Sequence, residues 1–600
     1  MVATLLKISP FGPLLAKELR VMSRRKRTYF LRFLFLALVL LMLATIISST
    51  SRYGDTDTSG VSLIQQQARI GGELFTAISV LCLMTAIVVA PILTSASINS
   101  ERLGKTLPIL LMTPMTAWQI AGGKVTSRLV TMWMFLLLTL PVLAIVFALG
   151  GVETRSVYVF LSLFAATSFS HAALGLVISC ITQRGYSAIL QIIGLLMVFY
   201  VASPLVASLL LWRLMRGGWS QEFWTGLWVV SNPVAAMIFS LPDAPTADRL
   251  GDWVWVAGVA FQLAVGLALL ALAAVLIRRL GDKMNRAGGG YSSLPELPVA
   301  QVVGQSATSD SITPRPTTLQ YAASGLTPNA MSRAVGDDPI LWREIREPML
   351  TGTWRRIVCA VLALLIGGSM YYSTWSELLR YDESHMVVAL LGLGVMLLGG
   401  CIASAACVAH ERDADTWELL LTTPLSGWQI VRGKLVGVSR SVVILFLLLA
   451  THLVFFTVFG PVSLLQTVIM LIIAATTTFL WLSIGMGLSL VCRSATTATV
   501  ICLALLCGVY VVLPTVINIV TNDQISAVWL WHFHPIAQMD STMRLNNDWT
   551  FYDNQRSHLS KLIIANTVVG LAGGAVLFGV VSWFDTLVGR AGVGRAGLRK

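Results

Sequence analysis

The residues with the clearest potential for chemistry are His532, His534, Asp540 and His558, which could give nitrogen and oxygen ligands to a metal ion. Aromatic residues alternate with the first two histidines, a pattern typical of a segment at a membrane interface. The stretch 219–228 has similar tryptophans without histidines. We therefore favour an interfacial segment over a metal centre, and we predict no metal site and no catalytic residue in this chain.

A second chemistry to consider is phosphate binding, because the chain contains Gly123-Lys124 and Gly433-Lys434. A phosphate loop needs the pattern G-x-x-x-x-G-K-[ST], whose backbone amides and hydroxyl hold phosphate and magnesium. The first pair lacks the leading glycine. In the second, Gly427 stands one residue too far away and leucine follows the lysine. The chain also has no polar region large enough for an ATPase domain, so we predict no ATP site and no cofactor in it.

The elements that must position these residues follow from composition. The 600 residues are 56% hydrophobic and 12% charged, and the charged share is about half that of soluble domains. Such a chain cannot cover a water-facing surface, which excludes a soluble enzyme, a disordered chain and a fibrous protein. The eight cysteines lie in apolar runs or at their edges and form no C-x-x-C pair, so we expect neither disulfides nor a cysteine metal site.

The hydrophobic pattern predicts an all-α polytopic membrane protein. A membrane helix needs about 20 apolar residues, and twelve runs reach that length. Their approximate bounds are 29–48, 74–97, 128–149, 157–180, 187–211, 253–277, 357–375, 386–409, 441–460, 464–491, 497–519 and 562–584.

The basic residues predict the orientation of these spans. With the N-terminus placed in the cytoplasm, 31 of the 42 Lys and Arg residues fall in cytoplasmic segments. Both termini are then cytoplasmic, and 29–48 is a retained helix rather than a signal peptide. The net charge of +13 is explained by topology, so no nucleic-acid partner is expected.

The second half of the chain repeats the first. Residues 101–124 and 411–434 are identical at 12 of 24 positions with a constant offset of 310. The stretch 13–20 also matches 339–346. We predict two six-helix halves in the same orientation, related by a pseudo-twofold axis along the membrane normal. The predicted divisions are a first half at 1–280, a flexible cytoplasmic linker at 281–338 and a second half at 339–600.

The repeated segment between spans two and three has a recognisable local pattern. Asp415-x-x-Glu418 is a capping-box pattern, and it predicts a helix of about two turns that ends before Pro424. Ser426-x-x-Gln429 is a second capping box that opens the next span, as Thr116-x-x-Gln119 does in the first half. Such a doubled short helix could dock a twofold-symmetric partner, or it could only anchor the membrane helices at the interface.

These residues resemble a known family. The pattern E-R-x-x-x-T-x-E-L-L-L-x-T-P-L-S-x-W-Q-I-x-x-G-K at 411–434 is similar to the coupling segment of type-2 ABC transporter permeases, exporter-like membrane subunits related to multicopper-enzyme maturation permeases. The stretch 339–346 resembles their amphipathic helix before the first span. The match is weaker at 101–124, where Lys105 and Pro108 replace the acids of the second copy.

The resemblance implies a permease subunit with two fused halves and a separate ATPase, docked as a dimer on the cytoplasmic face, that binds ATP and magnesium. It also implies export through a multi-pass protein of the bacterial inner membrane, in contact with membrane lipid. The residues expected to contact the ATPase are Glu101, Arg102, Thr106, Leu110 and Leu111 in the first half, and Glu411, Arg412, Thr416, Glu418, Leu420 and Leu421 in the second.

Three alternatives remain at this stage. An ion-coupled secondary transporter would place ionisable groups within its helices, whereas the predicted spans hold almost none besides His171 and His452, which we interpret as isolated hydrogen-bonding residues. A membrane enzyme would need gathered acids or histidines, which are not found. A scaffold that transmits force from the same ATPase without transport would differ from the implied permease only in its activity.

Overall fold

The structure is a computed structural model in which nearly all described segments are helical. It describes residues 18, 20, 26–53, 60–103, 106–182, 185–202, 221–241, 253–288, 338–346, 367–368, 371, 375, 378–414, 416–514, 516–517, 532–543, 545, 552–584 and 586. Within these residues there is no strand, which confirms the all-α class. Most of the predicted linker 281–338 and of the predicted span 357–375 lies outside them.

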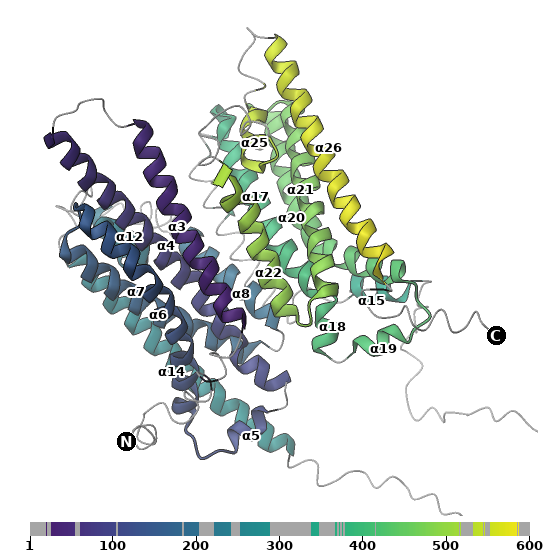
Figure 1. Cartoon of the computed structure of the whole chain (residues 1–600). Coiled ribbons are helices and arrows are strands. Elements are labelled where there is room, and N and C mark those ends of the chain that lie inside the picture. The colour runs from purple at the N-terminus through teal and green to yellow at the C-terminus, as the bar shows by residue number, and fades with distance from the viewer. Residues whose placement is uncertain are drawn as a thin grey trace, which may run out of the picture.

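The first half of the chain occupies one side of the molecule, coloured purple to teal in Figure 1. Its elements are α3 (Lys26–Tyr53), α4 (Gly60–Leu103), α5 (Leu107–Leu111), α6 (Ala117–Leu149), α7 (Thr154–Ile181), α8 (Gly185–Met197), the π-helix η1 (Val198–Ala202), α11 (Gln221–Ser231), α12 (Pro233–Phe239) and α14 (Val254–Gly288).

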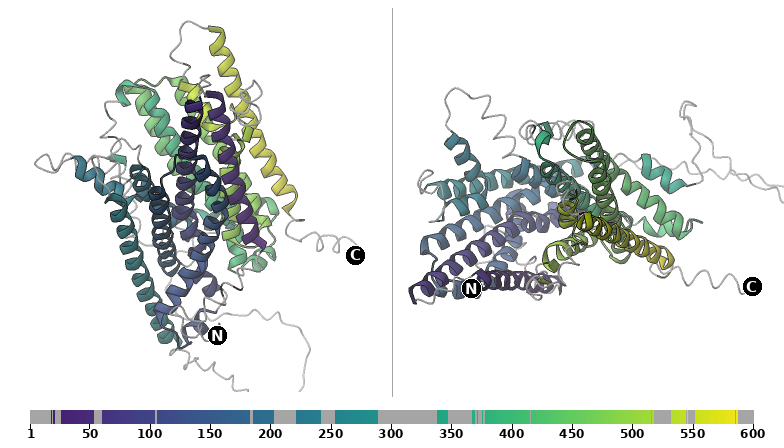
Figure 2. Two further views of the ribbon diagram at one scale, coloured as in Figure 1. Left: turned by 60° about the vertical axis from the view of Figure 1, so that its left-hand side comes forward. Right: turned by 90° about the horizontal axis from the view of Figure 1, so that it is seen from above.

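The second half lies beside it, coloured green to yellow, and the view from above in Figure 2 shows the same separation. Its elements are α15 (Pro339–Arg346), α17 (Glu383–Ala406), α18 (Ala409–Asp413), α19 (Trp417–Leu421), α20 (Gly427–Phe459), α21 (Leu464–Val491), α22 (Ala495–Cys507), the π-helix η4 (Gly508–Val512), α25 (Pro535–Met543) and α26 (Tyr552–Ser582).

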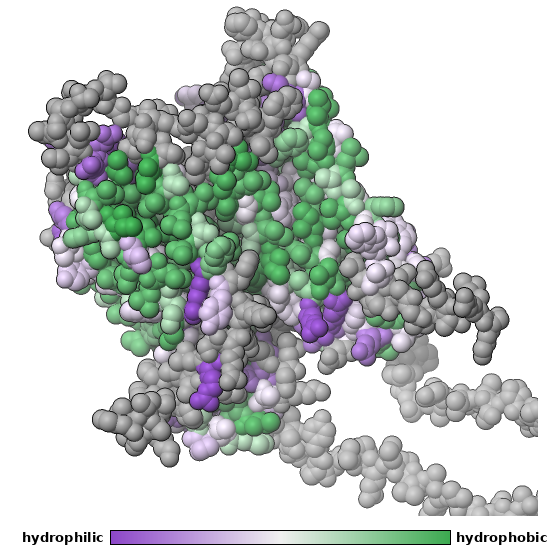
Figure 3. Space-filling model, in the orientation of Figure 1, coloured by the Kyte–Doolittle hydropathy of each residue, from purple (hydrophilic) through white to green (hydrophobic). Residues whose placement is uncertain are grey.

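Nine helices in the described part of the chain are long and apolar enough to cross a membrane. They are Gln65–Asn99, Ala117–Leu149, Thr154–Ile181, Val254–Asp282, Glu383–Ala406, Gly427–Phe459, Leu464–Val491, Ala495–Val512 and Leu559–Ser582. Each coincides with a predicted span. The predicted spans 29–48 and 187–211 overlap the shorter apolar helices Arg32–Ile47 and Ser187–Tyr200. Figure 3 shows the resulting apolar surface running across both halves.

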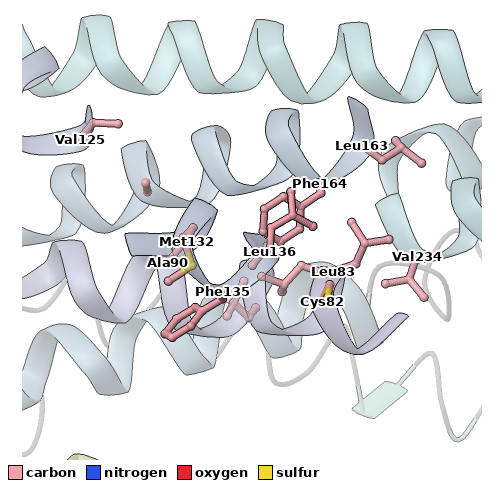
Figure 4. Packing of buried hydrophobic residues seen from close by; sticks show 14 of the residues in the cluster. Cys82, Leu83, Ala90, Val125, Met132, Phe135, Leu136, Leu163, Phe164 and Val234 are labelled. Carbon is pink, nitrogen blue, oxygen red and sulfur yellow. The ribbon is translucent and has the colours of Figure 1, made fainter. Parts of the chain in front are cut away.

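Each half has its own apolar core, organised by one central helix. In the first half α7 packs against α4 and α14, and in the second α21 packs against α17 and α26. Figure 4 shows part of the first core, to which α4 contributes Cys82 and Leu83, α6 contributes Phe135 and Leu136, and α7 contributes Phe164. None of the buried apolar clusters among the described residues crosses between the halves.

A glycine on the central helix permits a close approach to a neighbouring helix in each core, and the two glycines are 310 residues apart. A Cβ on Gly175 of α7 would lie 2.2 Å from the carbonyl oxygen of Pro91 in α4. A Cβ on Gly485 of α21 would lie 2.0 Å from Oγ of Ser404 in α17. These distances are far below van der Waals contact, so neither position has room for a side chain unless its neighbour moves.

The two π-helical segments also recur at the same offset. Tyr200 in η1 is hydrogen-bonded to Nε2 of His171 in α7 at 2.9 Å, and Tyr510 in η4 accepts from Nε1 of Trp481 in α21 at 3.0 Å. A π-turn widens the helix locally, and here each widened turn holds a tyrosine against the central helix of its own half.

His171 bonds within its own half, as expected, but the prediction that His452 is isolated is wrong. Nε2 of His452 lies 3.2 Å from Nδ1 of His385, and Nδ1 of His452 is hydrogen-bonded to the hydroxyl of Tyr371. Nε2 of His385 donates to the carbonyl oxygen of Leu378 at 2.9 Å. The pairing depends on α17 and α20 lying side by side, so hydropathy along the sequence did not reveal it.

Candidate functional site

The two repeated segments form matching short helices, α5 and α19, at the lower end of the molecule in Figure 1. The predicted capping boxes that open the next helices are present. Thr116 Oγ1 accepts from Gln119 N at 3.2 Å, and Ser426 Oγ accepts from Gln429 N at 3.3 Å. Both glutamine side chains bond back to the cap amide, so α6 and α20 each start at a fixed point after the turn.

The predicted start of the short helix is wrong. The N-cap of α19 is Thr416 rather than Asp415, it makes no side-chain cap, and the helix has five residues instead of two turns. Asp415 itself lies outside the described residues. The Thr416 hydroxyl donates to Oε2 of Glu411 at 2.5 Å, so it is not available to cap α19. Thr106 makes the same bond to Glu101 in the first half.

A buried lysine ties each repeated segment to the rest of its half. In the second half Nζ of Lys434 lies 2.7 Å from Glu344 of α15 and 2.7 Å from Glu411 of α18. Arg343 adds a longer contact of 3.6 Å to Glu411. We call these four residues the second ion cluster. It joins α15, the segment that carries α18 and α19, and the long helix α20.

The first half contains an equivalent first ion cluster. Nζ of Lys124 lies 2.7 Å from Glu18 and 2.9 Å from Glu101, and Arg128 lies 3.6 Å from Glu18. Three sequence motifs that are far apart in the chain therefore meet at one point. Sequence reasoning did not select Lys124, Lys434, Glu18 or Glu344 as site residues, although their repetition in both halves was a usable signal.

The electrostatics of the clusters favour ionised carboxylates. Burial alone would raise the pKa of Glu411, but Lys434, the Thr416 hydroxyl and Arg343 outweigh it and hold that pKa at about 2. The pKa of Glu18 is also lowered, because Lys124 and Arg128 outweigh its burial. Each cluster has two acids and two bases, so its formal charge is zero and its buried members, Lys124, Lys434 and Glu411, have partners of opposite charge.

The two arginines that were expected to contact the ATPase, Arg102 and Arg412, cap the central helices. Arg102 donates to the carbonyl oxygens of Thr182 at 2.9 Å and Cys180 at 2.6 Å, at the end of α7. Arg412 donates to that of Cys492 at 2.8 Å, just after α21. Helix C-termini favour cations with donors in this position. These arginines therefore fix the repeated segment to the end of α7 in the first half and of α21 in the second.

The residues that face outward differ in part from those predicted for docking. Leu110, Leu111, Leu420 and Leu421 are partly buried against the two cores. The side chains pointing away from the short helices are Ile109 and Met112 in the first half, with Glu418, Leu419 and Thr422 in the second. We call these five residues the outward surface, and Glu418 is its one predicted member. Ile109 and Leu419, 310 residues apart, are 66% and 71% exposed.

Both ring nitrogens of His534, one of the candidate metal ligands, are hydrogen-bonded to the protein backbone. Nε2 of His534 donates to the carbonyl oxygen of Tyr510 at 2.9 Å, and its Nδ1 accepts from the amide of Ile536 at 3.2 Å. The side chain of His558 lies outside the described residues. Among those that are described, no group of three His, Cys, Asp or Glu residues is arranged to hold a metal ion.

The fold and these segments define a class: a polytopic all-α membrane protein with a doubled, helix-capped segment braced against several spans. The sequence profile of the ABC-2 family transporter protein matches residues 13–281 and again 249–582. The chain belongs to this family, and the double match agrees with two permease halves fused in one chain. No individual curated protein matched the sequence. Membrane components of this family work in general with a partner ATPase subunit and are not themselves catalytic.

Proposed function

We propose that this chain is the membrane subunit of an ATP-driven exporter whose ATP is hydrolysed by a separate ATPase, bound as a dimer to α5 and α19. The observation that supports this most directly is the pair of ion clusters. Each joins one short-helix segment, through Glu101 of α4 or Glu411 of α18, to the lysine of the next long helix, and that lysine also contacts Glu18 or Glu344, at 2.7–2.9 Å. A force applied to α5 or α19 is then passed to a whole half.

In this proposal the end carrying α5 and α19 faces the cytoplasm of a bacterial cell, and the spans cross its inner membrane. Closure of the ATPase dimer pushes on the two short helices, and the halves rock against each other to alternate access. ATP and magnesium are held by the partner. A lipophilic or lipid-linked cargo is favoured by the apolar spans.

The location of buried charge disfavours an ion-coupled transporter. Among the described residues, the buried charged side chains apart from histidine are Lys124, Glu411 and Lys434. All three belong to the ion clusters beside the short helices, rather than to a relay along the spans. A non-transporting scaffold would keep the same outward surface, and only cargo-stimulated ATP hydrolysis in reconstituted complex separates it from an exporter.

The docking assignment can be tested by purifying the tagged chain in mild detergent from its native membranes and identifying co-purified proteins by mass spectrometry. We expect a P-loop ATPase with the wild type, and its loss when Ile109→Asp and Leu419→Asp are combined. Tyr381→Asp, an exposed site before α17 at the opposite end, is the matched control and should retain it. An intact wild-type chain without any ATPase would contradict the proposal.

A further inference from the structure

The two halves meet where their fifth spans begin. Helix α8 of the first half packs against α17 and α22 of the second. Its first residue, Gly185, approaches the start of α22 so closely that a Cβ there would lie 2.6 Å from Oγ1 of Thr496 and 4.0 Å from its Cβ. A displacement of the start of α22 would therefore change the contact between the halves directly.

The start of α22 is held by the second repeated segment. Oδ2 of Asp413, the last residue of α18, accepts a hydrogen bond of 3.0 Å from the amide of Ala495. Ser494 caps the same helix by accepting from Thr497 N at 3.3 Å. Asp413 directly follows Arg412, which caps α21. The segment that carries α18 is thus hydrogen-bonded both to the end of α21 and to the beginning of α22.

The first half has a different residue at the equivalent position. The residue 310 positions before Asp413 is Leu103, whose side-chain chemistry offers no hydrogen-bond acceptor. The polar contacts of this segment go instead to the end of the fourth span: Arg102 donates to the carbonyl oxygen of Thr182, and Asn99 donates to the Thr182 hydroxyl at 3.2 Å. The residue that corresponds to Asn99 in the second half is Ala409, which carries no polar side chain.

We propose that Asp413 is a positioning residue that carries movement of the second short-helix segment directly to the contact between the halves, so that the two segments are inequivalent in controlling this contact. The inference rests on the proposed function, since it needs an ATPase that moves α19. The first segment would act on the contact only indirectly, through the packing of its own half.

The test uses the full chain in complex with its ATPase, with Gly185→Cys and Thr496→Cys introduced together. The 4.0 Å between the two Cβ positions suits a disulfide, and each single-cysteine variant controls for native thiols. Cross-linking rate is compared without nucleotide and after trapping with ATP and vanadate. Asp413→Leu copies the first half, whereas Asp413→Asn keeps an oxygen that can accept from Ala495.

We expect trapping to change the cross-linking rate to a similar extent in the wild-type background and in Asp413→Asn, because both keep an acceptor for the Ala495 amide. In Asp413→Leu the change should shrink about tenfold, the size expected for losing one hydrogen bond to a charged acceptor. Asp413→Ala is a second variant with less added bulk, should the leucine variant not fold. If Asp413 had a purely structural role, replacing it would lower the protein yield without altering the change in cross-linking rate caused by nucleotide trapping.

Two outcomes would overturn different statements. If nucleotide is trapped but the response of Asp413→Leu and Asp413→Ala equals that of wild type, the inference fails while the proposed function stands. If the chain binds no ATPase, or trapping never occurs in the wild-type complex, the proposed function fails and the inference falls with it.

Discussion

The first and second ion clusters share a plan but are completed by different fourth residues. In the first, Arg128 comes from α6, is largely buried and lies 3.6 Å from Glu18. In the second, Arg343 comes from α15, is 60% exposed and lies 3.6 Å from Glu411. A buried cation compensates a carboxylate better than one screened by water. The comparison teaches that a repeated lysine can keep its role while its surroundings diverge.

Replacing the central lysines should have the largest effect on stability, and the size of the loss should differ between the two clusters. Lys434→Met leaves the buried Glu411 and the partly buried Glu344 without the cation that joins them, which is expected to cost about 3–5 kcal/mol of stability. Lys124→Met should cost less, because the buried Arg128 still compensates Glu18. Thermal unfolding in detergent measures both. Arg69→Gln, which breaks an exposed i,i+4 pair with Glu73, is the control and should change little. Equal losses of thermal stability in Lys434→Met and Lys124→Met would contradict the proposed difference between the clusters.

Acidification should remove the contribution of Glu411 next. Its pKa is about 2 when folded, against an ordinary value of 4.5, so its ionised form stabilises the fold. This contribution is complete above about pH 4.5 and is lost as the pH falls toward 2, amounting to roughly 3 kcal/mol at most. Melting temperature measured from pH 7 to pH 3 should therefore fall less steeply in Glu411→Gln than in wild type. A parallel pair of curves would argue against the assigned ionisation.

The two close-approach glycines should differ in the same kind of test. Gly175→Ala places a methyl group against the backbone of Pro91, which cannot turn aside, and should cost about 1–3 kcal/mol. The closest atom that Gly485→Ala meets is the hydroxyl of Ser404 at 2.0 Å, while Cβ of Ser404 at 2.9 Å and the amide nitrogen of Ala405 at 3.1 Å stay close. We expect Ser404→Ala to restore part of the stability lost in Gly485→Ala, because it removes only the hydroxyl. No side-chain substitution near Pro91 should restore the stability lost in Gly175→Ala, because the clashing atoms belong to the backbone.

Replacing the two arginine caps should give the smallest difference in stability between the halves. Arg102 donates to two carbonyl oxygens and Arg412 to one. Hydrogen bonds from a charged donor contribute about 1.5–3 kcal/mol each when buried, and less when partly exposed as here. Arg102→Met should thus destabilise more than Arg412→Met, which loses one bond and a cation–π contact with Trp417. Chemical denaturation of the purified variants gives the order, and the reverse order would rule out this account of the caps.

The parts of the fold that could be predicted depend on short-range pattern. Nine spans coincide with helices of suitable length in the described part of the chain, and the boxes at Thr116 and Ser426 form because both partners lie within one turn. The start of α19 was mispredicted because Thr416 bonds to Glu411, five residues back, and local capping rules do not include that competitor.

The candidate site was harder to predict because its contacts are long-range. Lys124 pairs with Glu18 across 106 residues and Lys434 pairs with Glu344 across 90, so spacing alone could not join them. Burial reversed the expected roles of other residues. Glu411 was expected to face a partner but is buried in an ion cluster, whereas Leu419, which was not selected, is the exposed apolar residue.

The difference between Leu103 and Asp413 has a consequence for how such a protein can evolve. A transporter assembled from two identical chains must carry every substitution twice, once on each side. Here the two copies are encoded separately, so one side can acquire an acid while the other keeps a leucine. Tandem duplication thereby allows a division of labour between the two sides that an assembly of identical subunits could not inherit.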